Sequence, residues 1–180
     1  MGYWETRGLR GSALEEMINH TNHFLREKGL AVVQKIPTSI TPVELDQQRG
    51  TIKLAYFEKK STVDYLGNIQ GVPICFDAKE TKQKSLPIAN IHEHQIEFMR
   101  DFHKQGGLSF LIVWFKRFDE YYLLPFETLQ QYWEGAKNGE RKSIPYRAFD
   151  KRLIIDAREE YILNYLETLN NYLDLKGEEK

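Results

Sequence analysis

Helical and strand-like spacings of apolar residues alternate along the chain. Apolar residues recur at helical spacing in four stretches, residues 12–28, 88–105, 126–133 and 158–175. Short apolar runs typical of strands cover four others, residues 30–34, 108–115, 120–124 and 153–155. These spacings predict amphipathic helices and buried strands, respectively. Together they predict an α/β fold with a central mixed β-sheet flanked by helices.

Turn-forming and capping residues separate these elements. Gly29 follows the first helical stretch and is a natural stop for it. Ser12 and Glu15 at its start have the spacing of a capping box. Residues 82–87 and 141–147 are polar or basic and predict loops. Because no repeat or low-complexity linker interrupts the pattern, residues 1–180 are predicted to form a single domain.

Residues 38–57 differ from the rest, because they have little helical period. Pro37 and Pro42 break any regular element at their start. Residues 46–50 form a polar turn, and residues 51–57 have the composition of a strand. From the residues alone, this segment is an ordinary β-hairpin.

Candidate chemistry lies in residues 61–81. Residues two apart in a strand share a face, so Ile74 and Phe76 point into a core with Ala78. Asp77 and Lys79 then share the opposite face with Cys75. Gly67-Asn68 and Gly71 are predicted to turn the chain back, which brings Asp64 close to Asp77.

Two converging carboxylates beside a lysine are the minimal layout of a metal-dependent nuclease site. Asp64 and Asp77 offer the oxygen ligands that Mg²⁺ prefers, and such an ion polarises a phosphate and activates water. Lys79 is placed to orient that water or to offset charge on the phosphate. Acid-x-lysine also occurs on many solvated strands, so the motif alone does not establish a nuclease.

Composition restricts the class of protein. The chain has 180 residues, of which 41% are hydrophobic and 28% charged, as in an ordinary soluble domain with a sizeable core. The longest apolar run, Leu108–Phe115, is too short to span a membrane, and the start lacks the apolar region of a signal peptide. A single cysteine, Cys75, excludes an internal disulfide. These features predict a cytoplasmic location without membrane association.

The net charge of −1 means that any DNA-binding face has to come from an uneven distribution of charge. Acidic residues gather in the C-terminal segment. The candidate DNA-binding cations are Arg7, Arg10, Arg49, Lys53, Lys82, Lys84, Arg141 and Lys142.

A longer set of motifs is more specific than the acid pair. In order along the chain, they are Arg10-Gly11, Leu14-Glu15, Asn19, Thr21-Asn22, Ala55-Tyr56-Phe57, Ser61-Thr62, Asp64-Tyr65, Asp77-Ala78-Lys79-Glu80-Thr81-Lys82, His92-Glu93-His94-Gln95-Ile96-Glu97, Lys137-Asn138-Gly139 and Arg141-Lys142-Ser143-Ile144. With these motifs the chain resembles the RecU-type Holliday junction resolvases, also labelled penicillin-binding-protein-related factor A. The resemblance implies a restriction-endonuclease-like fold and Mg²⁺-dependent resolution of four-way DNA junctions, with Mn²⁺ as a substitute ion.

The resemblance also implies roles for individual residues. Asp64, Asp77 and Glu15 would hold the metal, and Lys79 would handle the nucleophilic water. Thr62 and Gln95 are further candidates for the catalytic site. Glu15 has the alternative role of capping the first helix, and Gln95 that of a surface glutamine.

Further expectations concern partners and substrate. Residues 38–57 would form a stalk that enters the junction centre, and a homodimer would make paired symmetric nicks. Candidate partners are branched DNA and a RecA-type recombinase. Two other functions stay open: a non-catalytic junction-binding modulator of recombination, and a structure-specific endonuclease with another substrate.

Zinc is not expected, although three histidines, His92, His94 and His103, lie close together in sequence. They have no cysteine partners, and His-x-His on a helix is predicted to splay the two rings apart.

Overall fold

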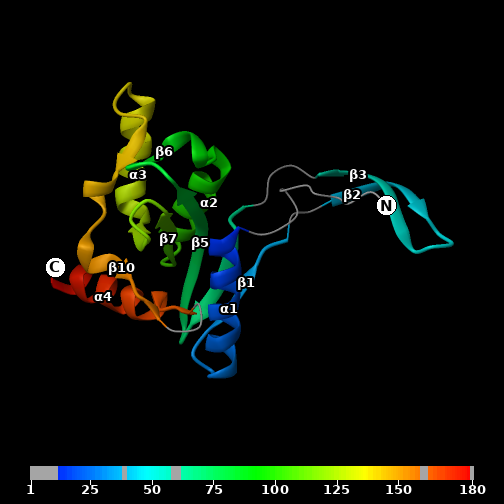
Figure 1. Ribbon diagram of the computed structural model, residues 1–180, viewed down its shortest axis with the longest axis horizontal. Coiled ribbons are helices and arrows are strands. Elements are labelled where there is room, and N and C mark those ends of the chain that lie inside the picture. The colour runs from blue at the N-terminus through cyan, green and yellow to red at the C-terminus, as the bar shows by residue number, and fades with distance from the viewer. Residues whose placement is uncertain (1–11, 38–39, 58–61, 159–161, 179–180) are drawn as a thin grey trace.

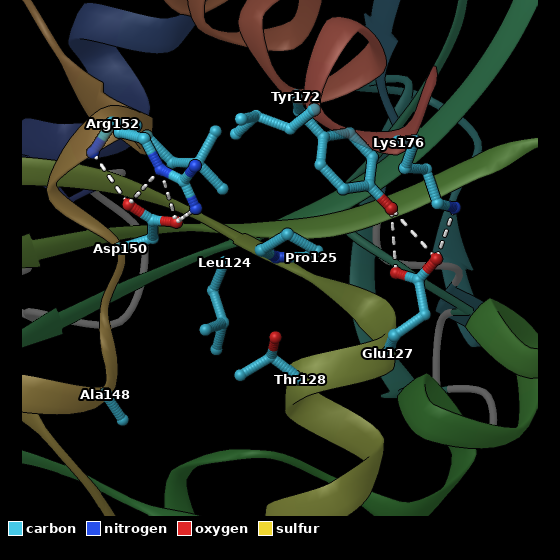
Figure 2. A pocket seen from close by; sticks show the side chains of 11 residues that line it. Leu124, Pro125, Glu127, Thr128, Ala148, Asp150, Arg152, Tyr172 and Lys176 are labelled. Atoms are coloured by element: carbon cyan, nitrogen blue, oxygen red, sulfur yellow. Dashed lines mark hydrogen bonds and ion pairs between the residues drawn. The ribbon is translucent and has the colours of Figure 1, made fainter. Parts of the chain in front are cut away.

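The computed structural model describes residues 12–37, 40–57, 62–158 and 162–178. Its centre is a six-stranded sheet in the order β1-β4-β5-β7-β8-β10 (Figure 1). These strands are β1 (Val32–Lys35), β4 (Tyr65–Ile69), β5 (Val72–Thr81), β7 (Leu108–Phe115), β8 (Glu120–Pro125) and β10 (Ile154–Ile155). β5 and β7 run parallel, whereas the other neighbouring strands are antiparallel. The predicted mixed sheet is therefore confirmed.

Helices cover both faces of this sheet. On one face, α1 (Ala13–Glu27) and α4 (Tyr165–Glu178) pack against a core that contains Ile74, Phe76 and Phe110. On the other face lie α2 (Glu93–Lys104) and α3 (Phe126–Lys137), with a second core. Alternation along β5 and β7 supplies both cores, as expected for central strands buried on both sides.

The start of α1 is as predicted. Ser12 and Glu15 form the capping box, and Gly29 has a left-handed φ of 67° just beyond the helix. Two other helix starts were predicted wrongly. α2 begins at Glu93 and not at residue 88, because residues Ile88–Asn90 form a separate 3-10 turn, η1, and His92 lies at the N-cap.

The C-terminal helix also begins later than the predicted residue 158. Ala157–Arg158 (β11) pairs with Ile162–Leu163 (β12) before α4 starts at Tyr165. α3, by contrast, is longer than residues 126–133 and continues through Gly135 to Lys137.

The predicted loops 82–87 and 141–147 contain two short strands. Ser85–Pro87 (β6) pairs antiparallel with Ser143–Pro145 (β9). Leu86 and Ile144 are fully buried in these strands, and each lies between a serine and a proline. 3-10 turns follow at Tyr146–Ala148 (η2) and Lys151–Leu153 (η3).

Residues Ile40–Asp46 (β2) and Thr51–Phe57 (β3) form a hairpin that extends away from the body (Figure 1). Asp46 Oδ1 accepts hydrogen bonds from the backbone N–H groups of Gln48 and Arg49, each at 3.2 Å, and these bonds order the turn. The predicted β-hairpin is confirmed, and it also projects. Within the described ranges, no helix is both long enough and apolar enough to cross a membrane.

Candidate active site

Asp77 lies in the middle of β5, with β4 on one side and β7 on the other. Its side chain is fully buried on the face that α2 and α3 cover. The backbone N–H of Asp64 donates to Asp77 Oδ1 at 2.6 Å. In return, Asp64 Oδ2 accepts from the N–H of Ala78 at 3.2 Å. The backbone at or next to each aspartate therefore holds the carboxylate of the other aspartate in place.

The turn that brings these aspartates together is the predicted one only in part: Gly71 forms it and Asn68 supports it, whereas Gly67 does not take part. Gln70 and Gly71, with φ of 49° and 94°, make a two-residue turn between β4 and β5. Gly67 lies inside β4 instead, where a Cβ would come within 2.5 Å of the Val32 carbonyl oxygen of the neighbouring strand. Asn68 supports the turn by accepting the Gly71 N–H at 2.8 Å.

Lys79 joins the aspartates to α2. Its Nζ lies 3.2 Å from Asp77 Oδ2 and 3.3 Å from Gln95 Oε1. Gln95 Oε1 also accepts the backbone N–H of His92 at 3.0 Å. Gln95 is buried and is therefore not the surface glutamine of the alternative interpretation. The start of α2 thus holds the lysine that faces the carboxylates.

Burial dominates the electrostatics of the two acids. Desolvation raises the pKa of Asp77 to about 6, although Lys79 opposes that shift, while the charge of Asp64 adds to it. The pKa of Asp64 is also raised, again mainly by burial. Two carboxylates whose charges are this poorly solvated gain from a nearby cation.

The carboxylate oxygens fit a hard divalent ion. Asp77 Oδ2 is buried and faces the Lys79 ammonium at 3.2 Å without a well-aligned hydrogen bond, so it retains lone pairs for a ligand. Asp64 supplies a second carboxylate beside it. Within the described part of the chain, however, no three His, Cys, Asp or Glu side chains form a group that is ready to hold a metal.

Glu15, the predicted third ligand, is engaged elsewhere. Its Oε2 accepts the Ser12 N–H at 3.1 Å and pairs with Lys35 Nζ at 2.8 Å. Its charge is nevertheless near enough to raise the pKa of Asp64. The arrangement therefore contains the predicted helix cap and leaves the ligand role a prediction.

Two other residues, Lys35 and Thr62, also lie close to these side chains in the structure or in the sequence. Lys35, which sequence reasoning missed, comes from β1, next to β4, so only the pairing of these strands reveals it. Thr62 is half-buried two residues before Asp64, and its role stays a prediction.

The candidate DNA-binding cations fall into separate groups. Arg49 and Lys53 lie on the hairpin. The antiparallel pairing of β6 with β9 places Lys84 beside Tyr146 at one end of that strand pair and Lys142 beside Ile88 at the other end. Their contacts include a hydrogen bond from Ile88 N–H to the Lys142 carbonyl at 3.1 Å. Arg7 and Arg10 lie outside the described residues.

The histidines are arranged differently from the prediction. His92 precedes α2, and its ring stacks on that of His94 with 5.4 Å between centroids, so the rings are not splayed apart.

Comparisons with known proteins place these residues in a wider set. The family model described as Recombination protein U (RecU) matches residues 9–171. "Holliday junction resolvase RecU" of Pediococcus pentosaceus is 39% identical over 172 residues, which cover 93% of this chain and 86% of that protein. The protein of the same name from a Geobacillus species is 45% identical, over 80% of this chain and 74% of its own length.

The chain is also similar to a third relative and to a solved structure. "Holliday junction resolvase RecU" of Staphylococcus aureus is 43% identical, over 76% of this chain and 68% of its own length. The solved Archaeoglobus fulgidus Hjc, titled a Holliday junction resolvase, aligns with a TM-score of 0.45 and 12% identity, over 88% of this chain and 99% of that chain.

Proposed function

The chain belongs to the RecU family, and we propose that it is a divalent-metal-dependent endonuclease that resolves four-way DNA junctions. The observation that carries the proposal is the grouping of Asp64, Asp77 and Lys79, in which the buried Oδ2 of Asp77 faces the Lys79 ammonium at 3.2 Å. The names of the curated relatives support the four-way junction as substrate.

Asp64 and Asp77 would hold Mg²⁺, with Mn²⁺ as a substitute, and Glu15 would join them after releasing Lys35. The bound ion would polarise the scissile phosphate and lower the pKa of water. Lys79 lies beside Asp77, where it would orient the attacking water and offset the charge that grows on the phosphate. Gln95 would hold Lys79 in that position through its Oε1 contact. Thr62 would lie at the margin of the site.

Substrate choice would depend on surfaces outside this group. The hairpin would enter the branch point with Arg49 near its tip, and Lys53, Lys82, Lys84, Arg141 and Lys142 would contact phosphates, together with Arg7 and Arg10. A homodimer would present two such sites about a two-fold axis, which matches a substrate of near two-fold symmetry. A RecA-type recombinase is a further candidate partner.

The test is to incubate the protein with a mobile four-way junction, a flap and a duplex, with and without Mg²⁺. We expect paired symmetric nicks in the junction that need the metal. Cleavage of the flap at an equal or higher rate would instead identify a structure-specific endonuclease with another substrate. Binding of the junction without cleavage in either Mg²⁺ or Mn²⁺ would identify a non-catalytic modulator.

A further inference from the structure

Exposed basic and aromatic side chains gather where β5 and β7 end. Three segments meet there: the turn after β5, the turn between β7 and β8, and the first residues after β9. The Lys116 N–H donates to the Thr81 carbonyl at 2.9 Å, and the Tyr146 N–H donates to the Lys84 carbonyl at 3.1 Å. We call this group the ridge; it consists of Lys82, Lys84, Arg117, Phe118, Tyr146 and Arg147.

Phe118 gives the ridge an exposed aromatic face on a fixed support. Its side chain is 36% exposed. Its ring centroid lies 4.4 Å from the ring centroid of Tyr146 and 6.4 Å from that of Phe115. Tyr146 is itself anchored, because its hydroxyl donates to Glu120 Oε2 at 2.5 Å, beside a second bond of 2.7 Å from Tyr122. The Phe118 ring is therefore held in place by its contacts with Tyr146 and Phe115, while part of it stays exposed.

The charges around Phe118 are unevenly matched. Glu80 pairs with Lys116, Asp119 accepts the Trp114 indole N–H at 3.1 Å, and Glu120 accepts both tyrosine hydroxyls. The acids of this region are thus satisfied within the protein. The remaining cations, as far as the described residues go, form no ion pair; they are Lys82, Lys84, Arg117 and Arg147.

The ridge continues the face that carries the catalytic group. Lys79 and Thr81 are two apart on β5 and share a face, and Thr81 is paired with Phe115, on which Phe118 packs. Two strand residues span about 7 Å. A DNA strand held at Lys79 can therefore reach the ridge within a few nucleotides.

We propose that the ridge binds an unpaired stretch of DNA beside the cleavage site, with its phosphates on the four cations and one base stacked on Phe118. Cations interleaved with an exposed aromatic ring are the combination that binds single strands, because an unpaired base offers a free π-face and a base in a duplex does not. The proposal rests on the proposed function, since it assumes a DNA substrate at Lys79. It adds a contact that selects unpaired bases.

The test measures binding in EDTA, so that it does not depend on cleavage. A labelled oligothymidine and a blunt duplex of equal length are titrated with the full chain and with Phe118→Ala. Leu173→Ala is the matched control, because Leu173 is 38% exposed on α4. We expect Phe118→Ala to weaken binding of the single strand about tenfold, with duplex binding unchanged. Phe118→Trp is expected to keep the affinity, and oligothymidine should quench its added emission.

The charged part of the ridge is tested by salt dependence. Arg117→Gln is expected to reduce the salt slope for oligothymidine by about one, whereas Arg26→Gln on α1 should leave it unchanged. The proposal is overturned if Phe118→Ala binds oligothymidine as Leu173→Ala does, or if it weakens single-strand and duplex binding equally. Failure of the protein to cut any junction would overturn the proposed function and leave this binding result intact.

Discussion

Strand β5, which carries the proposed catalytic residues, and the projecting hairpin differ in almost every physical respect. β5 is hydrogen-bonded on both sides and carries Asp77 fully buried between two cores. Among the strands that the structure describes, β2 and β3 of the hairpin pair only with each other, and Tyr56 on β3 is 64% exposed. Strand β5 can therefore hold its side chains in fixed positions, whereas the hairpin can change without disturbing the body. Under the proposed function, chemistry and substrate choice would therefore belong to parts that can be altered separately.

The hairpin also exposes large apolar side chains to solvent, whereas Ile74 and Phe76 of β5 are fully buried. Its exposed large hydrophobic residues are Ile40, Val43, Leu45, Ile52, Leu54 and Tyr56. A surface of this kind is unusual in a protein that acts alone and is typical of a contact region. Because a lone two-stranded hairpin is only marginally stable in water, we expect its order to increase when it is bound.

The largest effect is expected from Asp77→Asn in the catalytic strand. Loss of the carboxylate charge removes the main attraction for the metal, while phosphate contacts elsewhere are unchanged. Cleavage of a four-way junction should fall by roughly three orders of magnitude, as measured under single-turnover conditions. Binding of the junction by mobility shift should be preserved. Asp101→Asn on α2 is the control, and cleavage within about tenfold of wild type would refute the metal-ligand role.

Lys79→Ala is expected to have the next largest effect on cleavage. The lysine contacts Asp77 and Gln95, so its removal takes charge from the position of the phosphate without removing an oxygen ligand. A loss of about 100-fold, or about 3 kcal/mol, is typical of such groups. Metal affinity from calorimetry should survive, and Lys104→Ala should behave as wild type. Lost metal affinity with an unchanged single-turnover rate would contradict the assigned role.

The burial of Asp77 predicts a dependence of stability on pH that the hairpin does not share. Folding raises the pKa of Asp77 from 3.8 to about 6, so the folded state favours its protonated form. Without metal, the free energy of unfolding should fall as the pH rises from about 4 to about 6, by up to about 3 kcal/mol. Asp77→Asn should therefore melt above wild type at pH 8 and lose that advantage near pH 4, as thermal unfolding can show. If wild type and Asp77→Asn had equal melting temperatures at both pH values, burial would not destabilise the charged form of Asp77.

Glu15→Gln separates the cap of α1 from metal binding. Glutamine can serve in a capping box, whereas it replaces a carboxylate poorly on Mg²⁺. We expect unchanged thermal stability and a loss of cleavage of about tenfold. Ser12→Ala removes the other half of the box, so it should cost about 1 kcal/mol of stability and leave cleavage intact. Unchanged cleavage in Glu15→Gln would restrict Glu15 to the cap and its bond to Lys35.

Sequence reasoning predicted the parts of this comparison that depend on local periodicity. The alternation of residues 74–79 placed Asp77 and Lys79 on one face correctly, because residues two apart in a strand point to the same face. Gly71 was predicted in the turn between β4 and β5, but the part of Gln70 was missed, since a non-glycine residue with positive φ has no strong signal. The start of α2 was misplaced because Ile88 and Ile91 have helical spacing and yet belong to a 3-10 turn and its end.

Other features needed the chain to be folded. Lys35 reaches Glu15 because α1 packs against β1 at the edge of the sheet, and neither this packing nor the pairing of β1 with β4 can be read from residue spacing. β6 and β9 have three residues each, which is too short for a periodicity. The burial of Gln95 follows from the packing of α2 on the sheet, and polarity alone suggested a surface position.

The smallest effect is expected at the hairpin tip, and it concerns selectivity instead of rate. Replacing residues 46–50 by a shorter turn should spare folding, because these residues are polar and largely exposed. Non-specific duplex binding should also persist, since it depends on phosphate charge and falls with salt. The ratio of junction to duplex affinity at matched ionic strength should fall several-fold, and Arg49→Ala should do the same in milder form. Lys28→Ala on the far end of α1 is the control. A shortened hairpin that keeps the full ratio would place selectivity on the body, with residues 141–147 or the dimer contact as the remaining candidates.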